Sequence, residues 1–118
     1  MRDAPATPTT ALLRRLNAGA VLDALRGARA PGSGAVGGAM TGTEVMAATG
    51  LSRPTVHTVC DALIDLGWVR EAAGGEETAR PGRPARRYAF DARAGYVLGV
   101  DLGAHKVTVV LADLVGTA

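Results

Sequence analysis

The segment TGTEVMAATGLSRPTVHTVCDALIDLGWV, residues 41–69, constrains the fold more than any other part of the chain. Thr41 and Glu44 have the spacing of a capping box, in which two side chains satisfy unpaired backbone N–H groups at the start of a helix. Gly50 stands where that helix would end, because glycine adopts positive φ without a Cβ clash. Ser52 can then cap a second helix. The segment predicts two short helices joined by a tight turn.

The second helix is predicted to have two unlike sides. Pro54 is tolerated in its first turn. One buried stripe is predicted from apolar residues at spacings of three and four: Val56, Val59, Leu63 and Leu66. The other side carries short or basic polar groups suited to base edges and phosphates: Arg53, Thr55, His57, Thr58 and Asp61. An ordinary solvated face is the alternative, but a turn that presents the helix favours a DNA-binding helix-turn-helix. We therefore expect Ser52, Arg53, Thr55, His57 and Thr58 to contact DNA.

A β-hairpin is predicted directly after this helix. WVREA alternates as a strand does, residues 72–84 form a loop, and ARRYAF offers a returning strand. A hairpin in this position is a wing, and Trp68 is expected to pack it onto the second helix. The formal charge of +2 is mild, but arginines cluster here, so we expect Arg80, Arg83, Arg86 and Arg87 to contact DNA as well. The alternative is a basic loop that only aids solubility.

The remainder of the chain divides into three parts. Residues 1–9 are predicted to be a flexible tail, and a helix capped by Thr10 is predicted to run to about Arg29. A Gly-rich flexible connection follows as far as Met40. Two apolar β-branched runs, Val97–Leu102 and Val107–Leu111, suit strands covered on both faces. Two strands alone are marginally stable, so residues 94–118 are expected to begin a second domain after a first at 10–93.

This order of parts resembles the ROK family of repressors and sugar kinases. The matching pieces are the first helix with Asn17, GLSRPTV, LGWV, GRP at residues 82–84, and GVDLGAHKVTVVLADLVG at the end. The resemblance implies a mainly α fold with a β wing. It is a winged helix-turn-helix domain followed by an incomplete β-hairpin of an actin-like, sugar-kinase-like α/β domain. The family's kinases carry DxGGTK, where this chain has Ala104 and His105 in place of a glycine and the hydroxyl residue.

These features predict a sequence-specific DNA-binding transcriptional regulator, a repressor of sugar-related genes truncated before its effector-binding domain. It is expected to be no enzyme, because the altered DLGAHK segment and the absent later kinase parts leave no phosphoryl chemistry. Double-stranded DNA is the expected partner; the resemblance implies a sugar effector only with a complete kinase-like domain, and a homodimer. The alternatives are the N-terminal fragment of a sugar kinase, or a winged-helix protein-interaction module.

Cysteine usage and hydropathy narrow the remaining classes. Cys60 is the single cysteine, which excludes an intrachain disulfide and a Cys-based zinc cluster, and we expect it to be buried and inert. His57 has only His105 as a histidine partner, so no metal is expected, nor any cofactor. No apolar run reaches the length of a membrane span, and MRDAPATPTT lacks the apolar region of a secretory signal. A cytoplasmic protein without membrane partners is expected.

Overall fold

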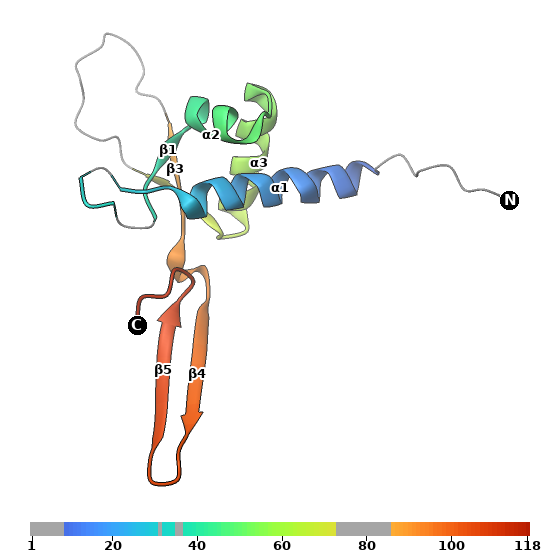
Figure 1. Cartoon of the computed structure of the whole chain (residues 1–118). Helices are drawn as coiled ribbons and strands as arrows, with labels where there is room; N and C mark the ends of the chain where they lie inside the picture. Colours follow the sequence, from blue (N-terminus) through green and yellow to red (C-terminus); the bar gives the residue numbers. More distant parts are fainter. Residues whose placement is uncertain (1–8, 31, 35–36, 73–85) are drawn as a thin grey trace, which may run out of the picture.

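The computed structural model describes residues 9–30, 32–34, 37–72 and 86–118. In these ranges three helices and a three-stranded sheet pack together, and a long β-hairpin extends away from them (Figure 1). Helix α1 spans Thr10–Gly27, α2 spans Gly42–Thr49 and α3 spans Arg53–Asp65. The cap of α1 is Thr9, whose Oγ1 accepts from the N–H of Leu12 at 3.1 Å. The prediction of Thr10 as the cap was wrong by one residue, because either threonine can supply the oxygen.

The turn between α2 and α3 is built as the sequence predicts. Thr41 Oγ1 accepts from the N–H of Glu44 at 3.2 Å, and the Thr41 hydroxyl also bonds the Glu44 carboxylate. Gly50 ends α2 in the left-handed region with φ of 76°, and its N–H donates to the carbonyl of Met46. Ser52 Oγ then accepts from the N–H of Thr55 at 3.4 Å at the start of α3. These caps fix where α2 ends and α3 begins.

The small sheet has the strand order β1-β3-β2, with all neighbours antiparallel. Strands β2 (Val69–Ala72) and β3 (Arg87–Phe90) are the two predicted wing strands, with Val69 opposite Phe90. Strand β1 (Met40–Thr41) pairs with the edge of β3 opposite β2. This strand was not predicted, because two residues carry no periodicity. The Gly-rich connection therefore ends in a sheet strand that leads directly into α2.

The core draws on all three helices and on the sheet. Tyr88 of β3 is its largest fully buried side chain, and Cys60 is fully buried as predicted. The cluster of buried side chains consists of Val21, Leu25, Val45, Val56, Cys60, Leu63, Val69, Tyr88 and Phe90. Leu66, predicted to extend the buried stripe of α3, is 71% exposed. It is the C-cap residue, where the chain has already left the helix that generated the stripe.

The hairpin consists of β4 (Tyr96–Leu102) and β5 (Val107–Asp113), paired antiparallel along their whole length. Residues directly opposite each other share a face of the ribbon. One face is strongly apolar, with Tyr96, Leu98, Val100, Leu102, Val107, Val109 and Leu111, each at least 55% exposed. The other face mixes Val97, Val110 and Ala112 with Gly99, Asp101 and Thr108. The two predicted strands are confirmed. Their sequences are similarly apolar, but in the hairpin the apolar side chains gather on one face and the other face is mixed.

The chain returns to the helical unit at the base of the hairpin. A 3₁₀ turn, η1 (Ala92–Ala94), joins β3 to β4, and its Ala92 carbonyl accepts from the N–H of Leu114 at 3.0 Å. Leu114 and Val115 are half-buried against the core. The residues just beyond β5 thus pack on the same core as the helices.

Candidate nucleic-acid interface

Helix α3 presents an exposed ridge directly opposite its buried stripe. Because an α-helix repeats every 3.6 residues, residues at spacings of three and four line up along one side. The buried side carries Val56, Cys60 and Leu63. The exposed side carries Pro54, Thr58, Asp61, Ala62 and Asp65. Ser52 and Arg53 are also exposed, at the N-terminal end of the same helix.

The N-terminal end of α3 is held in place by polar side-chain contacts. Arg53 Nη2 donates to Thr43 Oγ1 of α2 at 3.3 Å. The Ser52 hydroxyl donates to Thr55 Oγ1 at 2.9 Å. Thr55 is half-buried, so its hydroxyl serves the helix cap, while Ser52 and Arg53 remain at the surface. The candidate reading end of the helix is therefore fixed relative to α2.

His57 does not lie on the exposed side where its sequence position placed it. The residue is half-buried, and its Nδ1 lies 3.0 Å from the hydroxyl oxygen of Tyr88. The two rings meet edge to face, with centroids 6.3 Å apart. The prediction of an exposed His57 was wrong because its partner is 31 residues away in sequence and belongs to β3. Local periodicity contains no signal of such a contact.

Arg86 joins the wing to α3. Its Nε donates to Glu71 Oε1 of β2 at 2.7 Å, and its Nη2 donates to Asp61 Oδ1 of α3 at 2.9 Å. The guanidinium also lies over the Tyr88 ring, 5.1 Å from its centroid. The hydrogen bonds that Arg86 donates to Glu71 and, second, to Asp61 raise the pKa of Arg86 above its ordinary value. Asp61 and Glu71 are functional candidates that the sequence interpretation did not connect with Arg86.

Three other wing arginines were predicted to contact DNA: Arg80, Arg83 and Arg87. Arg87 is half-buried in β3, opposite Thr41 on one side and Ala72 on the other. Arg80 and Arg83 lie outside the described residues. Ser52, Arg53 and Thr58 are thus exposed on α3 or at its N-terminal cap, and Arg86 contacts the same helix at Asp61.

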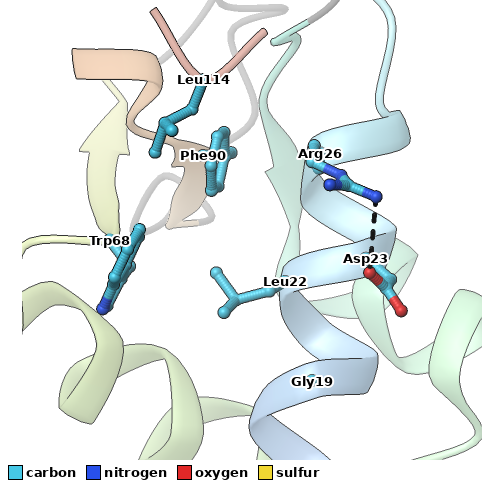
Figure 2. A pocket seen from close by; sticks show the side chains of 7 residues that line it. All are labelled: Gly19, Leu22, Asp23, Arg26, Trp68, Phe90 and Leu114. Atoms are coloured by element: carbon cyan, nitrogen blue, oxygen red, sulfur yellow. Dashed lines mark ion pairs between the residues drawn. The ribbon is translucent and has the colours of Figure 1, made fainter. Parts of the chain in front are cut away.

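Trp68 lines a cavity of about 350 Å³ between α1, the sheet and the end of the hairpin (Figure 2). The cavity is also lined by the apolar side chains of Leu22, Phe90 and Leu114. On its α1 side lies an ion pair, with Arg26 Nη2 3.9 Å from Asp23 Oδ1. The indole is 41% exposed. Trp68 thus lines this cavity together with residues of α1 and Leu114, and the expectation that it packs the wing onto α3 stays a prediction.

Comparison with known protein families also indicates a helix-turn-helix domain. Residues 16–73 match the model of the IclR helix-turn-helix domain, a range that covers α1 from Leu16 onward, α2, α3 and the first wing strand. No curated protein matches the chain. The match does not address the ROK resemblance, which stays a prediction.

The described residues give no sign of two other kinds of site. Each helix in those ranges is too short or too polar to span a bilayer. No group of three His, Cys, Asp or Glu side chains gathers there in the way that a metal ion requires.

The capped helix pair, the paired wing strands and the match to a helix-turn-helix family all indicate the same kind of domain. The chain is a DNA-binding transcription regulator with a winged helix-turn-helix domain.

Proposed function

We propose that the protein is a sequence-specific regulator that inserts α3 into the major groove and lays its wing along the adjacent backbone. The exposed N-terminal part of α3 carries this proposal, because it offers Ser52, Arg53 and Thr58 to solvent from a rigidly capped helix. Helices of this kind meet base edges with their N-terminal residues. Phosphate contacts from wing arginines, Arg83 among them, supply affinity, while contacts from α3 supply sequence preference.

We further propose that regulation is repression of sugar-related genes, as the ROK resemblance implies. In this proposal the hairpin belongs to a sugar-kinase-like effector domain, which binds a sugar and holds two copies together. The exposed apolar face of β4 and β5 supports it, since a face of seven apolar side chains is stable only when another layer covers it. Two recognition helices then address half-sites about one helical turn apart, or a multiple of that.

The protein is proposed to have no kinase activity. Asp101 and Lys106 remain from the phosphate-binding segment, but Ala104 and His105 replace its glycine and hydroxyl residue. A Cβ at a position of close backbone approach obstructs a phosphate. ATP turnover with hexoses is therefore expected to be nil, and measurable turnover would favour the sugar-kinase alternative.

DNA binding is tested with a duplex that the wild-type chain selects from a random-sequence pool. Affinity should fall steeply between about 50 and 200 mM salt, because counterions compete for the phosphates. Arg83→Ala should weaken binding to every duplex and make the salt slope shallower by about one unit. Arg26→Ala is the matched control, since it removes the same charge beside the cavity of Figure 2. Binding that ignores salt would favour the protein-interaction alternative.

A further inference from the structure

We propose that Arg86 is a positioning residue that ties the wing to the recognition helix and neutralises Asp61, and that it is not a phosphate contact. The inference rests on the proposed DNA-binding function. It assigns to this arginine a role that its place in a basic cluster does not suggest. The three residues concerned are Asp61 of α3, Glu71 of β2 and Arg86, which directly precedes β3.

The position of Arg86 makes it a suitable tie. It directly precedes β3, so its backbone lies at the end of the β2–β3 hairpin where the loop joins the paired strands. Glu71, 15 residues earlier, is on the partner strand, and Asp61, 25 residues earlier, is in the third turn of α3. One guanidinium therefore connects both strands of the wing to the helix that is proposed to read the bases.

The chemistry of the contact requires arginine. A guanidinium carries five N–H donors in a rigid planar fork, so Nε and Nη2 can serve two carboxylates at once. The Tyr88 ring lies beneath the group, and Tyr88 is itself bonded to His57 of α3. A lysine ammonium keeps the charge but is a single flexible point, which cannot hold both oxygens in this geometry. The wing is thus linked to α3 by two adjacent contacts.

Electrostatics gives the arrangement a second consequence. Asp61 lies on the exposed ridge of α3, where a free carboxylate would face DNA phosphates and repel them. Arg86 approaches this carboxylate to 2.9 Å and offsets its charge. Charge alone and positioning therefore predict opposite results when the two carboxylates are neutralised. More positive charge should strengthen DNA binding, whereas loss of the tie should weaken it.

The decisive experiment measures binding of the full chain to the selected duplex at several salt concentrations. The double variant Asp61→Asn, Glu71→Gln is expected to bind about threefold to tenfold more weakly than wild type, despite its added positive charge. Unchanged or tighter binding would overturn the proposal. The matched control is Asp65→Asn, which removes a carboxylate one turn further along the same exposed ridge. The control should bind as wild type or more tightly, and an equal loss in it would also overturn the proposal.

Arg86→Lys separates positioning from phosphate contact. A phosphate contact would survive this change, since lysine also binds phosphate as a point charge. The proposal expects a similar threefold to tenfold loss with an unchanged salt slope. Retained affinity, or a slope shallower by about one unit, would overturn it. Circular dichroism confirms that each variant is folded, and the double variant decides the matter if Arg86→Lys unfolds. Failure of the wild-type chain to bind any duplex would instead refute the proposed function.

Discussion

The hydroxyl oxygen of Tyr88 lies 3.0 Å from Nδ1 of His57, and this contact joins β3, the central strand of the sheet, to α3. Tyr88 is fully buried in the core, and its hydroxyl reaches the half-buried side of α3. A buried hydroxyl without a partner would cost free energy, so the contact favours one rotation of α3 against the sheet. The exposed ridge of α3 is set by that rotation.

Tyr88→Phe is expected to lower the free energy of unfolding by about 1 kcal/mol, because it removes one hydrogen bond and leaves the ring in place. Urea denaturation measures the change. Tyr96→Phe is the matched control, since Tyr96 is 59% exposed on the hairpin and its hydroxyl makes no hydrogen bond to another described residue. Equal effects of the two substitutions would show that the contact with His57 does not contribute.

The sequence predicted the elements whose signals are local. The caps at Thr41 and Ser52, the left-handed Gly50 and both wing strands lie where their residue types require them. The surroundings of the side chains at the candidate site were not predicted, because they depend on contacts between residues far apart in the sequence. His57 turns inward because Tyr88 is available from β3, and Arg86 is paired because Asp61 and Glu71 converge on it. Contacts between distant residues therefore decide which polar side chains of a helix or wing remain available at the surface.

The turn between α2 and α3 should be sensitive to substitution of its glycine. Gly50 has φ of 76°, and a Cβ built there meets nothing within 4 Å, so any cost is purely conformational. Gly50→Ala is expected to destabilise the protein by about 1–2 kcal/mol. Gly19→Ala is the control, because Gly19 is inside α1 with equally open surroundings. It should stabilise by about 0.5–1 kcal/mol. Thermal unfolding of both variants measures the difference, and matching signs would contradict this account.

Stability should decline at alkaline pH. Burial raises the pKa of the Cys60 thiol from 9.0 to about 11, and burial also raises the pKa of Tyr88. The unfolded chain therefore releases the thiol proton at lower pH than the folded protein does. The stability is fully present below about pH 9 and falls as pH rises toward 11, by on the order of 2 kcal/mol from Cys60.

Denaturant unfolding of wild type and of Cys60→Ala across this pH range tests the assignment. The variant is less stable throughout because it loses buried volume, but its decline with pH should be smaller. Tyr88, whose pKa is shifted in the same direction, contributes to the decline that remains. Identical pH profiles would remove Cys60 as a cause.

The apolar face of the hairpin should cause self-association of the 118-residue chain. Val100 and Val109 stand directly opposite each other at its centre, both more than half exposed. Replacing them together by Lys and Glu places opposite charges across the strands, a pairing that stabilises a hairpin by about 0.2–1 kcal/mol. Sedimentation velocity should show less association than wild type. Thr108→Lys, opposite Asp101 on the mixed face, is the control that should leave association unchanged.

Thr58 is a predicted DNA contact in the second turn of α3 whose side chain is exposed. It lies on the outward ridge of α3 and is exposed, whereas Thr55 and His57 are half-buried and bonded within the protein. Thr58→Ala is expected to change which sequences the chain selects. Binding to the wild-type duplex should weaken by about 1 kcal/mol, with little effect on random DNA. Thr10→Ala removes another exposed threonine hydroxyl, at the start of α1, and should change neither. An equal loss on selected and random duplexes would show that Thr58 contacts only the backbone, because phosphate contacts carry no sequence information.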